Sequence, residues 1–124
     1  MLTKLGWLAV AGACGAVARY ALAGIAQRAA QADFPLGTLA VNVLGCFLFG
    51  VVWTFGDRLL ISGETRFLIL TGFMGAFTTF STFAFETAGM LGDSQWWPAV
   101  GNLAAHNGLG VVSIFLGMAT GRLL

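Results

Sequence analysis

The side chains best suited to binding a polar ligand lie within one apolar stretch of this sequence, between Gly72 and Phe83. Hydroxyl groups occupy four of five successive positions there: Thr78, Thr79, Ser81 and Thr82. A helix that faces lipid has no use for four hydroxyls, because each unsatisfied polar group in hydrocarbon costs several kcal/mol. We therefore expect an interrupted membrane helix, with its break buried where something polar passes or binds.

Two phenylalanines share this stretch. Phe80 and Phe83 are three residues apart, so they lie on one helix face. An aromatic ring has a positive edge and a negative face, so its edge can meet an anion. Asn42, on the preceding apolar segment, supplies an amide donor, and Thr38 lies one turn before it. Ordinary core packing also places phenylalanines at this spacing. The residue types alone therefore indicate only a polar site in a membrane.

The composition places these residues in a lipid bilayer. Of the 124 residues, 58% are hydrophobic and 9% are charged, against roughly 25% charged residues in soluble domains. A soluble domain of this size would need far more polar surface, so we expect an integral membrane protein. The net charge of +1 gives no reason to expect a nucleic-acid partner. The sequence has no paired carboxylates, metal-ligand spacing or nucleophile–base pair, so we do not expect an enzyme.

Four apolar segments must position the polar stretch. Each holds about 20 residues or slightly more, enough to cross a hydrocarbon core ~30 Å thick. These segments are Leu5–Ala26, Leu36–Phe55, Phe67–Met90 and Ala99–Leu123. The expected fold class is all-α, with residues 1–124 forming one four-helix transmembrane domain. A cleavable signal peptide is the alternative for the first segment, but Arg19 fits poorly beside the candidate cleavage site.

The positive charges give this chain only a weak preference for one orientation. With four spans, the two termini and the second connection share one side of the membrane. That side carries four cationic residues and the other carries two: Lys4, Arg58, Arg66 and Arg122 against Arg19 and Arg28. A chain with so little bias could insert both ways and form antiparallel dimers of one sequence.

Small residues recur inside the apolar segments. Gly117 and Gly121 form a GxxxG pair, and Ala11 and Gly15 form a similar pair. Such faces let helix backbones approach closely, either within one subunit or at a dimer seam. Four helices packed in this way enclose no lumen, so a transport function would favour an oligomer. The two cysteines, Cys14 and Cys46, lie mid-span and are expected to behave as small apolar residues.

Three motifs resemble those of a known family. They are Gly-Ala-Val-Ala-Arg-Tyr at 15–20, Gly-Thr-Leu-Ala-Val-Asn-Val-Leu-Gly at 37–45, and Gly-Ala-Phe-Thr-Thr-Phe-Ser-Thr-Phe at 75–83. In this order they resemble the small fluoride channels of the Fluc or CrcB family. The resemblance implies a passive fluoride-selective channel, built as an antiparallel dual-topology homodimer in a prokaryotic inner membrane. Its implied role is the release of cytoplasmic fluoride, which accumulates when HF crosses the membrane and dissociates.

The resemblance also implies roles for individual residues. Phe80, Phe83 and Asn42 would line the pore, and hydroxyls would form a polar track beside them: Thr38, Thr79, Ser81 and Thr82. Fluoride is small and tightly hydrated, so a dry pore must replace its water with close donors. Arg19 would sit in an aqueous vestibule that concentrates anions. The alternative for Arg19 is a side chain that reaches the lipid headgroups.

A central Na⁺ is the cofactor that the family implies. Its ligands here would be the backbone carbonyls of Gly75 and Thr78 from two antiparallel chains, because a helix break frees carbonyls that need a partner. Many family members have a second glycine where this chain has Ala76. We expect the break to persist despite that difference, although alanine has fewer backbone conformations open to it.

The last polar residues belong to the ends of the expected path. Glu86 follows Phe83 by three residues and either extends the hydroxyl track near one pore end or sits solvated near the interface. On the fourth helix, Gly110 and Ile114 stand where family members often carry Ser and Thr. His106, Asn107 or Ser113 could compensate there. A lone intramembrane histidine is more often a satisfied hydrogen-bonding group than a proton carrier.

Two other classes of membrane protein have a similar length. A small dual-topology exporter of drugs or other cations would need a carboxylate in its first helix, and residues 5–26 contain none. A non-transporting assembly subunit would also be short and glycine-rich, but it gives no reason for a hydroxyl cluster on an interrupted helix. A fluoride channel remains the interpretation that uses all three motifs.

Overall fold

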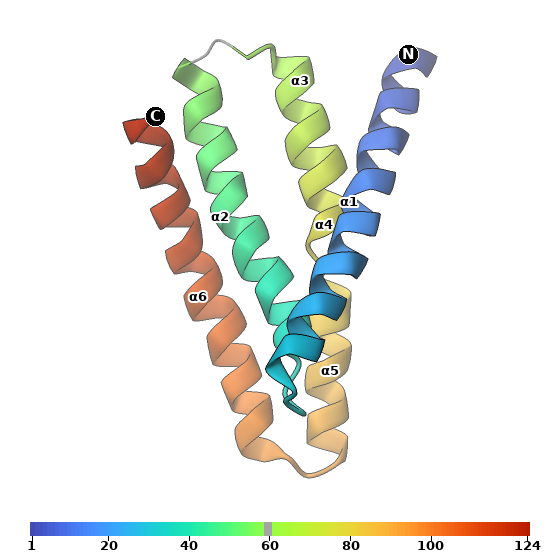
Figure 1. The fold of residues 1–124 in the computed structure, drawn as a ribbon, viewed down its shortest axis with the longest axis vertical. Coiled ribbons are helices and arrows are strands. Elements are labelled where there is room, and N and C mark those ends of the chain that lie inside the picture. Colours follow the sequence, from blue (N-terminus) through green and yellow to red (C-terminus); the bar gives the residue numbers. More distant parts are fainter. Residues whose placement is uncertain (59–60) are drawn as a thin grey trace.

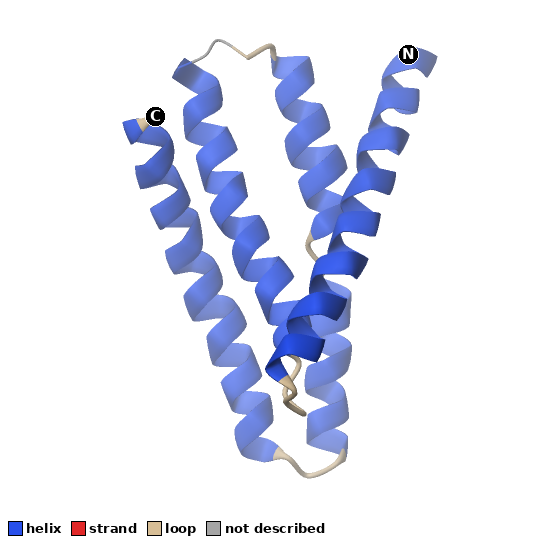
Figure 2. Ribbon diagram, in the orientation of Figure 1, coloured by secondary structure: helices blue, strands red, loops and turns tan. Residues whose placement is uncertain are grey.

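A computed structural model describes residues 1–58 and 61–124, and in this part of the chain every regular element is a helix (Figures 1 and 2). The first two membrane helices are α1 (Leu2–Ala30) and α2 (Leu36–Arg58), and the last is α6 (Trp96–Leu123). The third is built from successive pieces: α3 (Gly63–Phe67), a π-helical segment η1 (Leu68–Met74), α4 (Gly75–Phe77) and α5 (Phe80–Gly92).

Four helical stretches are long and apolar enough to cross a membrane: Leu2–Ala30, Leu36–Gly56, Gly63–Gly92 and Trp96–Leu123. The predicted set of four membrane helices is therefore confirmed, and each begins before or ends beyond the predicted span. The π-helical segment was not predicted. Figure 1 shows both termini at one end of the molecule, together with the end of α2 and the start of α3, as four consecutive spans require.

A single side chain organises the connection between α1 and α2. The Gln27 amide nitrogen donates to the carbonyls of Ala32 and Phe34, at 2.6 and 3.1 Å. Its amide oxygen accepts from the Gly37 N–H at 2.9 Å. Gln27 of α1 thus satisfies two carbonyls of the connecting loop and one N–H in the first turn of α2, which holds these two helices in a tight antiparallel turn.

Glycines bring α2 and α6 into backbone contact. A Cβ added at Gly117 would collide with the Phe47 carbonyl oxygen, and one at Gly50 would collide with the Ile114 carbonyl oxygen. A Cβ at Gly121 would lie 2.8 Å from the Val51 carbonyl oxygen. The GxxxG pair of α6 therefore packs against α2 of the same subunit, which decides between the two roles left open by the sequence.

Glycines also bring α1 into close contact with the third membrane helix. A Cβ at Gly15 would collide with the Phe73 carbonyl oxygen of η1, and a Cβ at Gly72 would lie 2.8 Å from the Ala11 Cβ. A small apolar core lies beside this contact and contains Val41, Leu70, Met74 and Phe77. The core and the two glycine contacts fix the third membrane helix at the position where it is interrupted.

Candidate functional site

The third membrane helix is interrupted at two threonines. Thr78 and Thr79 have extended backbones, with φ and ψ of −89° and 159° and of −148° and 109°. Both the N–H and the hydroxyl of Thr78 donate to the Met74 carbonyl, each at 3.1 Å, which ends the upper half of the helix. The Thr79 hydroxyl accepts from the Thr82 N–H at 3.2 Å and so caps α5. The predicted interruption is confirmed.

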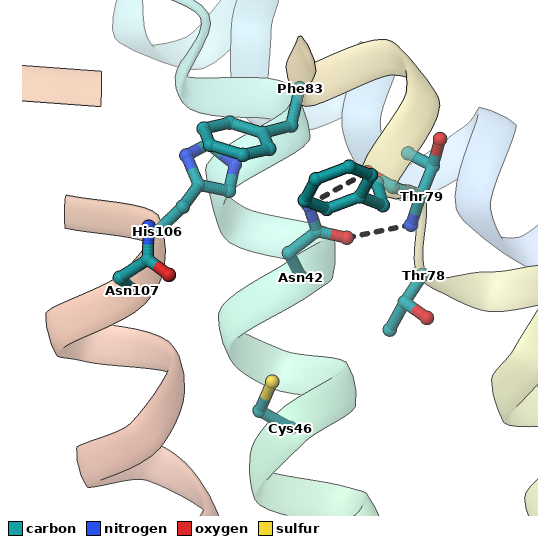
Figure 3. A pocket seen from close by; sticks show the side chains of 8 residues that line it. Asn42, Cys46, Thr78, Thr79, Phe83, His106 and Asn107 are labelled. Atoms are coloured by element: carbon teal, nitrogen blue, oxygen red, sulfur yellow. Dashed lines mark hydrogen bonds between the residues drawn. The ribbon is translucent and has the colours of Figure 1, made fainter. Parts of the chain in front are cut away.

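Asn42 of α2 pairs with the backbone of this break. Its amide nitrogen donates to the Thr79 carbonyl at 3.0 Å, and its amide oxygen accepts from the Thr79 N–H at 2.7 Å. The bond from the Thr79 N–H replaces the helical bond that this group has lost at the break. An amide nitrogen carries two hydrogens, so Asn42 has a second N–H to offer beside the break (Figure 3).

Arg19 supports the break from the opposite side. Its Nε donates to the Ala76 carbonyl at 3.0 Å, so the half-buried side chain of α1 reaches the C-terminal end of α4. A cation there interacts favourably with the free carbonyls of a helix end. The structure thus gives Arg19 a partner within the protein, and its role in an aqueous vestibule stays a prediction.

The hydroxyls at the start of α5 form a connected group. The Thr79 hydroxyl donates to the Thr82 hydroxyl at 2.9 Å and lies 3.4 Å from the Ser81 hydroxyl. Three of the four predicted hydroxyls of this stretch are therefore neighbours in space. The fourth, on Thr78, is turned back to the Met74 carbonyl.

A pocket of about 230 Å³ lies beside the break (Figure 3). Its lining comes from α2, the break, α5 and α6, namely Asn42, Cys46, Thr78, Thr79, Phe80, Phe83, His106 and Asn107. The structure thus brings together five predicted site residues from three membrane helices, along with a predicted Na⁺ ligand. Cys46, expected to be only a small apolar residue, also lines the pocket. Ser81, Thr82, Thr38, Glu86 and Ser113 lie outside its lining.

Aromatic rings stack in series along one wall of the pocket. The Phe80 and Phe83 rings meet edge to face, with centroids 5.5 Å apart and planes at 64°. The His106 ring lies against Phe83 at 4.3 Å. Phe83 is buried, whereas 78% of Phe80 is exposed. In an edge-to-face pair one positive ring edge meets the face of the other ring, and the ring edges outside that contact are what an anion can use.

Two further polar contacts fix α5 to its neighbours. The Thr38 hydroxyl donates to Glu86 Oε1 at 2.6 Å, which links α2 to α5. Glu86 also borders a second pocket of about 300 Å³. On the α6 side, the fully buried Asn102 donates to the Thr87 hydroxyl at 2.9 Å, and that hydroxyl donates to the Phe83 carbonyl at 2.8 Å. The Thr87–Asn102 pair was not predicted, although Asn102 lies one turn before His106 in the sequence.

A family model described as CrcB-like protein, Camphor Resistance (CrcB), matches residues 6–118. This chain belongs to the CrcB family. A fluoride-specific ion channel FluC of Nitrosococcus oceani is 54% identical over 125 residues, and one of Solidesulfovibrio magneticus is 52% identical over 125 residues. Both matches cover 100% of the two chains compared. A FluC of Nitratidesulfovibrio vulgaris is 48% identical over 124 residues, covering 99% of this chain and 100% of the relative. The resemblance inferred from the three motifs is confirmed.

The break frees the two backbone carbonyls that were predicted to bind Na⁺, and that cation site stays a prediction. In a continuous helix the Gly75 carbonyl would accept from the Thr79 N–H, and the Thr78 carbonyl from the Thr82 N–H. Here the Thr79 N–H donates to Asn42 Oδ1, and the Thr82 N–H donates to the Thr79 hydroxyl. Both carbonyls have given up their helical donors, and such oxygens are what an unwound membrane helix offers to Na⁺.

The two departures from the CrcB motifs have structural explanations. Ala76 lies inside α4 in a helical conformation, and so does Gly75, with φ −61° and ψ −32°. No glycine in the described residues has a positive φ, so the helix opens through extended threonines and does not need a second glycine. On α6, a Cβ at Gly110 would lie 3.6 Å from Cys46 Sγ. That position therefore packs on α2, and α6 contributes His106 and Asn107 to the pocket.

Proposed function

We propose that this chain is a fluoride-selective ion channel through which cytoplasmic fluoride leaves a prokaryotic cell passively. One observation carries the proposal. The helix break, two phenylalanine rings and Asn42 line one pocket, in a chain whose relatives at up to 54% identity are named fluoride-specific ion channels. Such release would confer fluoride resistance wherever HF crosses the membrane and dissociates inside. A passive path requires no catalytic group, so we propose no enzyme activity.

In the proposed path, protein donors replace the water that hydrates fluoride. The edges of Phe80 and Phe83 present weakly positive hydrogens, and the second N–H of Asn42 is a full hydrogen-bond donor. The connected hydroxyls of the first turn of α5 can rotate to present hydrogens in turn. No lysine or arginine is among the pocket's lining residues. The ion would therefore be bound strongly enough to enter and weakly enough to leave.

We propose that the working channel is an antiparallel homodimer in the inner membrane. Phe80 lines the pocket yet is 78% exposed in one chain, which supports a second copy that completes the wall. The glycine contacts pack helices closely within the subunit and leave no room between them. The pocket is therefore the proposed place for the ion path. A Na⁺ bound between the Gly75 and Thr78 carbonyls of two chains would supply positive charge that holds these oxygens together at the dimer axis.

The direct test is fluoride efflux from liposomes that contain only the purified protein, with chloride efflux measured in the same preparation. We expect rapid fluoride release, recorded with a fluoride electrode, and little chloride release. Protein-free liposomes measure the leak of HF through lipid. Folded protein that released neither ion would contradict the proposal, and equal release of both ions would contradict the selectivity.

A further inference from the structure

The single histidine of the chain is held in one tautomer. His106 Nδ1 lies 3.1 Å from the Asn102 carbonyl oxygen, and a carbonyl oxygen can only accept a hydrogen bond. Nδ1 must therefore carry the hydrogen. In the neutral ring, Nε2 is then left with a bare lone pair, because a neutral imidazole has one donor and one acceptor nitrogen.

This second nitrogen is buried without a partner. Within the described residues, His106 Nε2 has no hydrogen-bond partner and no appreciable contact with solvent. The ring lines the pocket beside the break and lies against Phe83 (Figure 3). A buried lone pair without a donor is unfavourable. A proton on Nε2 changes the group from a bare acceptor into a charged donor, and a buried charge needs a partner of opposite sign.

A proton on His106 would be the source of positive charge among the residues that line this pocket. Of the eight lining residues, His106 is the one that can become positive, and Cys46 of α2 is the other titratable member. On α5, the charged group nearest to this wall is Glu86, whose Oε1 accepts from the Thr38 hydroxyl of α2. The remaining lining side chains are neutral amides, hydroxyls and phenyl rings. Protonation of one atom would therefore change the pocket from neutral to positive.

We propose that His106 is a proton-controlled anion ligand of this pocket. The imidazolium form donates its Nε2–H to the anion, whereas the neutral form presents a lone pair that repels it. The proton comes from water and stays on the ring. The inference rests on the proposed function for the identity of the anion as fluoride. It adds that fluoride occupancy rises as the pH falls, because the proton on Nε2 makes the ring a donor to the anion.

The first test needs no ion conduction. Because the chain has one histidine, labelling histidine with ¹⁵N gives one imidazole signal set, and its shifts report the ratio of protonated to neutral rings. Coupling between two binding events is reciprocal. Fluoride should therefore raise this ratio by about tenfold at a fixed pH near 7 if it binds the imidazolium about tenfold more tightly. Chloride at equal concentration controls for ionic strength. A ratio that fluoride leaves unchanged would overturn the proposal.

The second test measures fluoride efflux as a function of pH. Wild-type flux, after subtraction of the leak from protein-free liposomes, should fall about tenfold from pH 5.5 to pH 8. His106→Gln keeps an N–H donor that does not titrate, so its flux should lose that dependence. Wild-type flux that is independent of pH would overturn the role of His106 and leave the channel standing. Wild-type protein that conducts at no pH would overturn the channel, and the histidine signal would still decide whether fluoride binds there.

Discussion

The two sides of α2 solve different problems with different residue types. Toward α6, Gly50 and Gly117 bring backbones together because neither residue has a side chain. Toward the break, Asn42 brings an amide to Thr79 and replaces the helical bond that the Thr79 N–H has lost. Both arrangements pack a membrane helix closely, but only the second leaves a polar hydrogen free. The difference indicates that glycines, which lack a side chain, bring the helices of the scaffold together, whereas the amide side chain of Asn42 helps to build the polar site.

The largest effect is expected from filling the glycine contact. In Gly117→Ala the new methyl collides with the Phe47 carbonyl oxygen, and overpacking of this kind costs about 3 kcal/mol. We expect a lower midpoint of thermal unfolding in detergent and a loss of the folded peak in size-exclusion chromatography. Gly108→Ala on the same helix is the matched control, because nothing lies within 4 Å of its Cβ position. Equal behaviour of the two variants would contradict the packing role.

The next largest effect concerns the polar side of α2. In Asn42→Asp the side chain still accepts from the Thr79 N–H, but it loses its donor and adds a negative charge beside the path. At an effective dielectric constant near 20, that charge opposes an anion at close range by up to about 4 kcal/mol. We expect fluoride efflux from liposomes to fall by at least about a hundredfold. Asn42→Ala removes the bonds to Thr79 without adding a charge, so it separates these two effects. Wild-type efflux in Asn42→Asp would place Asn42 away from the pore.

A smaller effect is expected from the phenylalanines. Phe80→Ile and Phe83→Ile remove ring edges, each worth about 1 kcal/mol to a partner, so fluoride efflux should fall about fivefold in each variant. Because Phe83 is buried and Phe80 is mostly exposed, only Phe83→Ile should also lower the unfolding midpoint of the single chain. Phe85→Ile is the control, since Phe85 is 79% exposed on the same helix and does not line the pocket. Unchanged fluoride efflux in both Phe80→Ile and Phe83→Ile would mean that neither phenylalanine lines the ion path.

The smallest effect is expected at the cap of α5. Thr79→Ala removes the oxygen that accepts the Thr82 N–H, and loss of such a cap costs about 1 kcal/mol. Thr79→Ser should restore most of the stability, measured as the midpoint of thermal unfolding. Thr120→Ala removes a hydroxyl that only donates to the Leu116 carbonyl on an exposed turn. A loss as large in Thr120→Ala as in Thr79→Ala would mean that the cap has no special role.

Much of the scaffold followed from the sequence for simple physical reasons. Apolar segments of sufficient length predict membrane helices because lipid leaves few other choices. The hydroxyl cluster after Gly75 predicted the break for the same reason, since four hydroxyls need partners. Spacing alone placed Phe80 and Phe83 on one face, and the structure brings them to one pocket with Asn42.

The partners of individual polar groups did not follow. Spacing along a helix shows which residues share a face, but it does not show which neighbouring helix that face meets. For this reason the bond from Arg19 to the Ala76 carbonyl, the pairing of Thr38 with Glu86, and the Thr87–Asn102 contact emerged only in three dimensions. The π-helical segment η1, which lies against α1 through Gly15 and Gly72, likewise was not predicted from residue types.

The break at Thr78 and Thr79 has an electrical consequence. It divides one long array of aligned peptide dipoles into two shorter arrays, whose facing ends lie within the membrane. The end of α4 carries partial negative charge, which Arg19 meets, and the beginning of α5 carries partial positive charge equivalent to roughly half an elementary charge. The protein thus has opposite potentials side by side in a medium of low dielectric constant, and the positive one at the start of α5 comes from the backbone itself.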